Sequence, residues 1–321
     1  MAKAVCGRFA PTPSGRMHLG NVFCALLAWL SAKKQGGTIT LRIEDLDKPR
    51  CPAGSDMLLE EDLHWLGLEW DTGGSAGGKD APYYQNRRFD IYAAYFAQLQ
   101  KLGLTYPCFC NRAELHAAQA PHLSDGRILY AGTCRHLTAE QTAAKARTKD
   151  PAQRLRLPDT AVSFIDGHYG PYTQNLAAEC GDIILRRSDG VYAYQLAVVV
   201  DDALMGITEI VRGCDLLSST PQQLYLYQLL GFTPPSFIHV PLLMAADGRR
   251  LSKRDRDLDL GFLRQHFVSP QPIIGLLAFL AGLLPTPEPV SAKELLPLFS
   301  WQKVPHNNII VSEKLLNLFK L

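Results

Sequence analysis

The sequence predicts an α/β protein in which helices cover a parallel sheet and a long insertion divides the sheet into two halves. A short apolar strand at residues 4–9, a helix from Leu19 and a second strand at residues 38–43 form a strand–helix–strand unit, which implies parallel pairing. Residues 106–181 differ in character, with clustered cysteines and many turn residues, and we expect them to be the insertion. Strand-like apolar runs then return at residues 182–186, 192–200, 207–212 and 238–243.

The composition indicates a globular protein of two or three domains. The 321 residues are 47% apolar and 20% charged, and the net charge of +2 means that polyanion binding would depend on local patches. The most apolar run, residues 273–284, lies between prolines and is shorter than the roughly 20 residues of a membrane-spanning helix, so it predicts a core helix. With no signal peptide, heptad pattern or disulfide framework visible, we expect a cytoplasmic monomer with no membrane partner.

The loop after the first strand has the features of a phosphate site. Pro11, Pro13 and Gly15 make it tight, and it leads into a helix N-terminus, where unpaired N–H groups and a partial positive charge favour anions. His18 begins that helix and adds a donor for a phosphate oxygen. The alternative is an ordinary strand–turn–helix connection with a chance histidine.

Charged residues follow the second predicted strand, at the sheet edge where ligands bind in open α/β proteins. They are Arg42, Glu44, Asp45 and Asp47, and Glu44 would project beyond the carboxyl end of the strand. The alternative is a solvated acidic loop. Two helices, at residues 56–68 and 85–102, then lead to the insertion.

The insertion carries a candidate metal site. Cys108, Cys110 and Cys134 lie on polar loops, which are poor places for core thiols, and together they suit a tetrahedral zinc site with one further ligand. By spacing alone, that ligand would be His136; the alternative is three unrelated thiols. A short helix from residue 112, a polar helix at residues 138–148 and strands within residues 154–181 complete the predicted insertion.

The second half of the predicted sheet ends in a basic loop. The nearly all-apolar run at residues 192–200 predicts a central strand, and Pro221 suits the first turn of a helix at residues 220–230. Residues 249–255 then hold four cations after an Asp-Gly turn, and Lys253 could reach a phosphate. The alternative is a basic surface loop without a ligand. Because this loop and the loop before His18 are both suited to phosphate and both follow strands of the same predicted sheet, a nucleotide site is favoured. Residues 258–321 predict short helices with proline breaks.

Five stretches in the expected order resemble the glutamyl branch of the class I aminoacyl-tRNA synthetases. The class's ATP-binding signatures, H-I-G-H and K-M-S-K-S, resemble H-L-G-N at 18–21 and L-S-K-R at 251–254. Asn21 replaces the second histidine but keeps a polar donor, and Leu251 replaces methionine but stays apolar. The glutamyl branch is indicated by R-F-A-P-T-P-S-G at 8–15, L-R-I-E-D-L-D at 41–47 and E-I-V-R-G-C-D-L at 209–216.

The resemblance implies a Rossmann-like sheet of the class I synthetase (HUP) type, a zinc-binding insertion and a short C-terminal helical region. Residues 1–105 and 182–257 would form the catalytic domain, residues 106–181 the insertion, and residues 258–321 a region that contacts the tRNA stem. Residues 256–321 are too few for the anticodon-binding region of an ordinary glutamyl-tRNA synthetase, so we expect none.

The resemblance also implies site residues. Arg8 and Arg212 suit carboxylates, Glu44 would hold the α-ammonium of glutamate, and an arginine at position 212 favours glutamate over glutamine. His18 and Lys253 would be catalytic, stabilising charge on the phosphates of ATP, with Mg²⁺ as counterion. The implied glutamate-binding residues are Arg8, Phe9, Ala10, Pro11, Thr12, Glu44, Tyr194 and Arg212. The implied ATP-binding residues are His18, Gly20, Asn21, Leu251, Ser252 and Lys253. For the structural zinc, the family places Tyr130 as the fourth ligand, which leaves His136 in reserve.

The truncated relatives in this branch, the glutamyl-queuosine tRNA(Asp) synthetases, are the group that the chain resembles over nearly its whole length. The resemblance implies tRNA-independent activation of L-glutamate with ATP, followed by transfer to queuosine at the first anticodon position of tRNA(Asp). The first alternative is a truncated glutamyl-tRNA synthetase that charges the 3′ end of tRNA(Glu). A pantothenate synthetase-like adenylyltransferase or a non-catalytic RNA-binding remnant would not need the cysteines, the arginine at 212 and both ATP signatures together.

Overall fold

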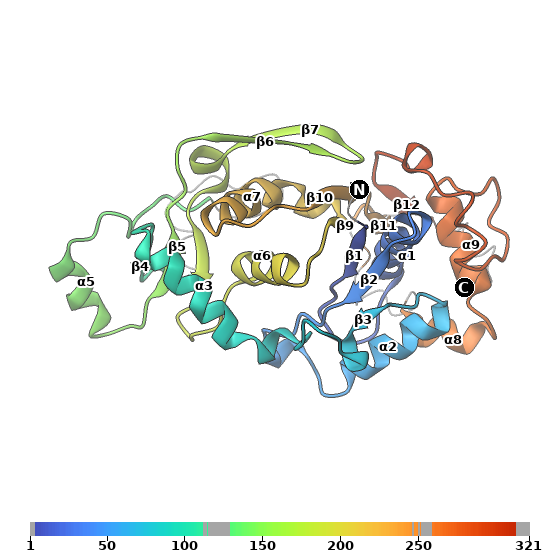
Figure 1. Ribbon diagram of the computed structural model, residues 1–321, viewed down its shortest axis with the longest axis horizontal. Coiled ribbons are helices and arrows are strands. Elements are labelled where there is room, and N and C mark those ends of the chain that lie inside the picture. The colour runs from blue at the N-terminus through green and yellow to red at the C-terminus, as the bar shows by residue number, and fades with distance from the viewer. Residues whose placement is uncertain are drawn as a thin grey trace.

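The computed structural model describes residues 4–111, 114, 129–245, 247–249, 251 and 259–312, and it contains the expected parallel sheet. Its strands are β1 (Cys6–Phe9), β2 (Thr38–Leu41), β3 (Thr72–Gly73), β9 (Glu209–Gly213) and β10 (Ser236–Val240). β1, β2 and β3 pair in parallel, and β9 pairs in parallel with β10. The two groups meet where the N–H of Thr208 donates to the carbonyl of Cys6 at 2.9 Å, with β9 beside β1 (Figure 1). The order of strands therefore reverses between β1 and β9, which is where ligands bind in such sheets.

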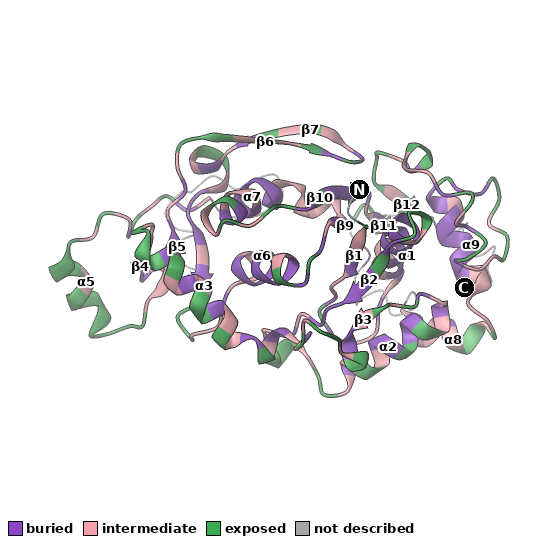
Figure 2. Cartoon of the chain, viewed as in Figure 1, coloured by how far each residue is buried: buried purple, intermediate pink, exposed green. Residues whose placement is uncertain are grey.

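Helices cover this sheet and form two large apolar clusters. The first cluster joins β1 and β2 to α1 (Leu19–Lys34), α2 (Ser55–Leu66), α8 (Leu260–His266) and α9 (Gln271–Leu280). The second includes α3 (Phe89–Lys101), α6 (Tyr194–Leu204) and α7 (Thr220–Leu229). Most of α9 is buried, in agreement with the prediction of a core helix there (Figure 2). The core thus fixes α1 directly behind the loop that links it to β1.

The insertion is built around antiparallel strands. β4 (Thr105–Cys108), β5 (Ala152–Leu155) and β8 (Ile183–Arg186) form one sheet, and β6 (Ala161–Asp166) and β7 (Gly170–Asn175) form a hairpin. The exposed helix α5 (Ala139–Ala146) lies at the far end of the molecule (Figure 1). The prediction that residues 182–186 resume the parallel sheet is wrong, because β8 pairs antiparallel with β5. Strand pairing of this kind depends on long-range contacts that a four-residue apolar run does not specify.

The predicted central strand at residues 192–200 is also wrong, because these residues begin the helix α6. The helix is buried from Leu196 to Asp202, so it shows no polar face that would reveal a helical period. A short apolar run is compatible with either a buried strand or a buried helix, and tertiary packing decides between them. The consequence for the site is that Tyr194 is the first residue of a helix rather than part of a strand.

The C-terminal region contains a strand that the sequence did not predict. β12 (Ile309–Val311) pairs in parallel with β11 (Leu243–Ala245), which follows β10. The chain after α9 therefore returns to pair with the segment that follows β10. Residues 112, 113, 115–128 and 252–258, which include the predicted helix from Arg112 and most of the basic loop, lie outside the described residues. Among the helices that the structure describes, none is long and apolar enough to cross a membrane.

Candidate active site

A cavity of about 740 Å³ opens at the carboxyl ends of β1, β2, β9 and β10. The loop after β1 forms one wall, α1 and α6 contribute their first turns, and the ends of β9 and β10 close the opposite side. All eight residues implied for glutamate line this one cavity: Arg8, Phe9, Ala10, Pro11, Thr12, Glu44, Tyr194 and Arg212. Of the residues implied for ATP, the cavity is lined by His18, Gly20, Asn21 and Leu251. Ser252 and Lys253 lie outside the described residues.

His18 forms the N-terminal cap of α1. Its Nδ1 accepts a hydrogen bond from the N–H of Gly20 at 3.1 Å, and Oδ1 of Asn21 accepts one from the N–H of His18 at 3.3 Å. A neutral imidazole that accepts at Nδ1 carries its proton on Nε2, so Nε2 is a donor. The replacement of the family's second histidine by Asn21 therefore preserves a cap that orients His18.

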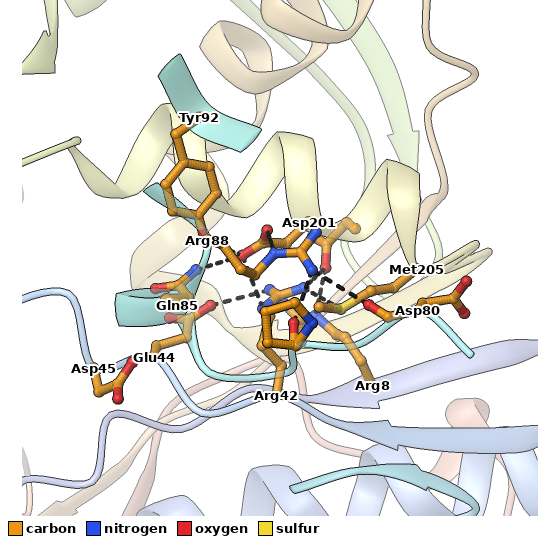
Figure 3. A network of polar contacts seen from close by, with 12 residues as sticks. Arg8, Arg42, Glu44, Asp45, Asp80, Gln85, Arg88, Tyr92, Asp201 and Met205 are labelled. Carbon is orange, nitrogen blue, oxygen red and sulfur yellow. Dashed lines mark hydrogen bonds and ion pairs between the residues drawn. The ribbon is translucent and has the colours of Figure 1, made fainter. Parts of the chain in front are cut away.

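A buried network of arginines and carboxylates lies beneath the cavity (Figure 3). Arg42 is fully buried, and its guanidinium donates to Asp202 Oδ1 at 2.6 Å and to Glu44 Oε1 at 3.0 Å. Asp201 lies 3.7 Å from Arg42 Nε and accepts hydrogen bonds from Arg88, Gln85 and Tyr92. The surrounding carboxylates raise the pKa of Arg42 against the opposing effect of burial. Arg42 thus holds Glu44 in place from below.

Arg8 is tied to the same network. Its Nη1 donates to the carbonyl of Val211 on β9 at 3.0 Å, and its Nε lies 3.7 Å from Asp202 Oδ1. Asp202 therefore contacts both Arg8 and Arg42, and these two arginines flank Glu44. Burial raises the pKa of Glu44, while the cations of Arg42 and Arg8 oppose that shift.

Arg212 lies at the opposite side of the cavity and is 3% exposed. Its Nε donates to Nε2 of His239 at 3.0 Å, and its Nη2 donates to Oγ1 of Thr220 at 2.9 Å. Its Nη1 has no hydrogen-bond partner within the described part of the chain. Burial lowers the pKa of Arg212, and burial raises that of the neighbouring Tyr194. A buried guanidinium with an unused donor is suited to an anionic ligand.

The three cysteines of the predicted metal site come together in the insertion. The Sγ atoms of Cys108, Cys110 and Cys134 all lie within 4.8 Å of one another, and Tyr130 Oη lies 3.5 Å from Cys108 Sγ. The tyrosine hydroxyl also accepts from the N–H of Cys134 at 2.8 Å, whereas His136 is not part of this group of possible ligands. Four such atoms in one small cluster could hold a metal ion, and thiolates suit zinc.

Several residues of the site escaped the sequence analysis. Arg42 was predicted only as a charged residue after the second strand, and no role was predicted for Asp202. The two-residue spacing of Arg42 and Glu44 could have placed both on one face of the chain. His239 and Asp166 could not be recognised from the sequence, because each is the only titratable residue of a short, mainly apolar strand. Cys24, on α1, also lines the cavity, and burial raises its pKa to about 11.

Comparison with known proteins shows the family to which the chain belongs. Residues 4–316 match the family of class I tRNA synthetases (E and Q), catalytic domain. The chain is 48% identical over 308 residues to a glutamyl-Q tRNA(Asp) synthetase of Symbiobacterium thermophilum, covering 95% of both chains. The chain belongs to the glutamyl-Q tRNA(Asp) synthetases within this class I family. A second relative of that name, from Nitratidesulfovibrio vulgaris, is 46% identical over 98% of both chains.

The fold of this family member also resembles that of a glutamate tRNA ligase of known structure. The chain superposes with a TM-score of 0.83 and 30% identity on a glutamate tRNA ligase of Elizabethkingia meningosepticum, in complex with its amino acid. The superposition covers 99% of this chain but 69% of the ligase. The class I synthetase fold predicted from the motifs is therefore confirmed, including its mixed α/β character and parallel sheet.

Proposed function

We propose that this synthetase activates L-glutamate with ATP in the absence of tRNA and then esterifies queuosine at the first anticodon position of tRNA(Asp). The names of the two relatives described above support queuosine of tRNA(Asp) as the acceptor. The single observation that carries the activation step is the shared cavity, where one loop from Arg8 to Asn21 contributes residues for both glutamate and ATP. It is thus a ligase of the aminoacyl-tRNA synthetase type.

Glutamate would be held by charge at both ends. Glu44, supported by Arg42, would bind the α-ammonium, and the unused Nη1 of Arg212 would bind the side-chain carboxylate. Arg8 would hold the amino acid from the β1 side. The α-carboxylate oxygen would then attack the α-phosphorus of ATP, the bond to the β-phosphate oxygen would break, and pyrophosphate would leave. Positioning and electrostatics would supply the catalysis, with no covalent enzyme intermediate.

The phosphates would lie against the start of α1. His18 would donate from Nε2, the N-terminus of α1 would add its partial positive charge, and Lys253 would contribute a cation. Mg²⁺ would accompany ATP as its counterion. In the second step, a hydroxyl of queuosine would attack the carbonyl carbon of glutamyl-adenylate, form the ester and release AMP.

Amino-acid-dependent exchange of pyrophosphate into ATP tests the activation step. We expect exchange with glutamate in the absence of tRNA, and a preference for glutamate over glutamine on the order of 10³-fold or more. The reason is that the neutral amide leaves a buried guanidinium uncompensated. Exchange that requires tRNA, or that glutamine supports equally well, would contradict the proposal.

Charging assays decide the acceptor. Radiolabelled glutamate is offered with tRNA(Asp) bearing queuosine, the same tRNA bearing guanosine at that position, and tRNA(Glu). We expect stable label on the first substrate alone. Stable label on tRNA(Glu) would instead support the alternative, a truncated glutamyl-tRNA synthetase.

We also propose that the cysteine cluster holds one structural zinc ion with Tyr130 as fourth ligand. The purified protein is expected to contain about one zinc per chain, and Cys134→Ser to lose most of it. Tyr130→Phe should release zinc to a chelator faster than the wild type, measured with a colorimetric zinc indicator. His136→Ala is the matched control; if it loses zinc and Tyr130→Phe does not, the assignment of the fourth ligand is wrong.

A further inference from the structure

Arg212 is held by a residue that does not line the cavity. The register of β9 and β10 places His239 directly beside Arg212, and the two side chains meet at 3.0 Å between Nε and Nε2. His239 is fully buried, and burial lowers its pKa. Because the Arg212 Nε–H can act only as a donor, Nε2 of His239 is the acceptor in this contact and carries no proton.

This hydrogen bond fixes the tautomer of His239. Because Nε2 accepts from Arg212, the neutral ring carries its proton on Nδ1. Nδ1 lies 2.6 Å from Oδ2 of Asp166, and both side chains are excluded from solvent. The carboxylate of Asp166 thus selects the one tautomer that can receive Arg212, as a buried carboxylate does for the histidine of a catalytic triad.

Asp166 is itself held rigidly at the end of β6. It accepts hydrogen bonds from the N–H groups of His168 at 3.0 Å, Tyr169 at 2.9 Å and His239 at 3.1 Å. The next residue, Gly167, lies against β10, where a Cβ atom would meet Ile238 Cγ1 at 2.7 Å. The β6–β7 hairpin of the insertion therefore approaches β10 closely enough to reach His239 from behind.

We infer that Asp166 and His239 are positioning residues that aim the Arg212 guanidinium at the side-chain carboxylate of the substrate and thereby set its selectivity for an acid over an amide. We call the three residues the Asp166–His239–Arg212 triad. His239 and Thr220 occupy two nitrogens of the guanidinium, and Nη1, which has no partner among the described residues, is left for the ligand. The inference rests on the proposed function, because it assumes that Arg212 binds the amino acid. It extends the site to an element of the insertion that lies outside the catalytic sheet.

Asp166→Asn tests the triad without removing any atom that lines the cavity. In this variant the amide NH₂ at position 166 faces Nδ1 of His239, so the ring must carry its proton on Nε2 instead. The Nε2–H would then point at the Nε–H of Arg212, and the hydrogen bond between them would be lost. We expect kcat/KM for glutamate in the exchange reaction to fall on the order of 10–100-fold, through KM for glutamate, with KM for ATP unchanged. Ser163→Ala, an exposed change in the same hairpin, is the control and should match the wild type.

A second substitution separates positioning from structural damage. In His239→Gln the side-chain oxygen can accept a hydrogen bond from Arg212, and this ability does not depend on a tautomer. The double variant Asp166→Asn/His239→Gln should therefore recover most of the kcat/KM for glutamate that is lost in Asp166→Asn alone. A purely structural role predicts that the double variant is no better than Asp166→Asn. Wild-type kcat/KM in Asp166→Asn, or failure of the double variant to recover, overturns the inference.

The tautomer can be observed independently of activity. Nitrogen chemical shifts of ¹⁵N-histidine-labelled protein, assigned to His239 with the His239→Gln variant, should show a protonated Nδ1 in the wild type and a protonated Nε2 in Asp166→Asn. If the wild type does not exchange pyrophosphate with glutamate while the shifts follow this pattern, the proposed function fails and the described tautomer stands. A protonated Nε2 in the wild type overturns the triad whatever the activity.

Discussion

Arg212→Ala is expected to lower kcat/KM for glutamate in pyrophosphate exchange by about 30- to 4,000-fold. Removing one partner of a buried charge pair costs about 2–5 kcal/mol, and each 1.4 kcal/mol is a factor of ten. The effect should appear in KM for glutamate, because Nη1 of Arg212 is the donor left for a carboxylate. Initial rates at varied glutamate and saturating ATP measure it.

Two variants sharpen this test. Arg212→Lys keeps the charge but loses the planar fork, so its activity should lie between that of the wild type and that of Arg212→Ala. Arg147→Ala removes an exposed arginine at the end of α5 and should leave exchange unchanged. Equal activity of Arg212→Ala and the wild type would show that glutamate is bound elsewhere. Thermal unfolding of all three variants verifies that they are folded.

The sequence predicted those parts of the fold that local pattern determines. The strand–loop–helix unit from β1 to α1, the helix α2 and the proline-started helix α7 were foreseen with nearly correct ends, and a core helix was foreseen in the apolar run that contains most of α9. The errors, α6 and β8, are short apolar segments whose type or partner depends on distant residues. β12 is short as well, and its pairing with β11 joins residues far apart in the sequence.

In the candidate site, too, some residues are marked by a local sequence pattern and others are identified only by contacts between distant parts of the chain. Motif residues on the loop from Arg8 to Asn21 could be found because their function leaves a dense pattern of glycine, proline and histidine. Supporting residues such as Asp166 and His239 left no pattern, since their role arises only when the insertion folds against β10. A supporting residue needs the right neighbours, and neighbours distant in sequence are known only from the folded chain.

Arg42 is such a supporting residue, and Arg42→Ala is expected to lower the free energy of unfolding by about 3–5 kcal/mol. The change leaves Asp202, Asp201 and Glu44 without the cation that they share, in a region where Arg42 is 0% exposed. Asp202 and Glu44 each lose a hydrogen bond from Arg42, while Asp201 keeps those from Arg88, Gln85 and Tyr92. The buried carboxylates then repel one another with less positive charge between them. A shift of the urea midpoint at unchanged m-value measures the loss.

The double variant Arg42→Met/Asp202→Asn distinguishes loss of packing from loss of charge balance. It removes the cation together with the carboxylate that lies 2.6 Å from it, so it should be more stable than Arg42→Met, which fills the same space but leaves Asp202 charged. If the double variant is no more stable than Arg42→Met, loss of the side chain itself, rather than unpaired charge on Asp202, accounts for the loss. Glutamate exchange should stay low in the double variant, because Glu44 has lost its partner at 3.0 Å and Arg8 its carboxylate at 3.7 Å. Recovered stability without recovered exchange would show that the buried Arg42–Asp202 pair serves the orientation of Glu44 and Arg8 rather than folding.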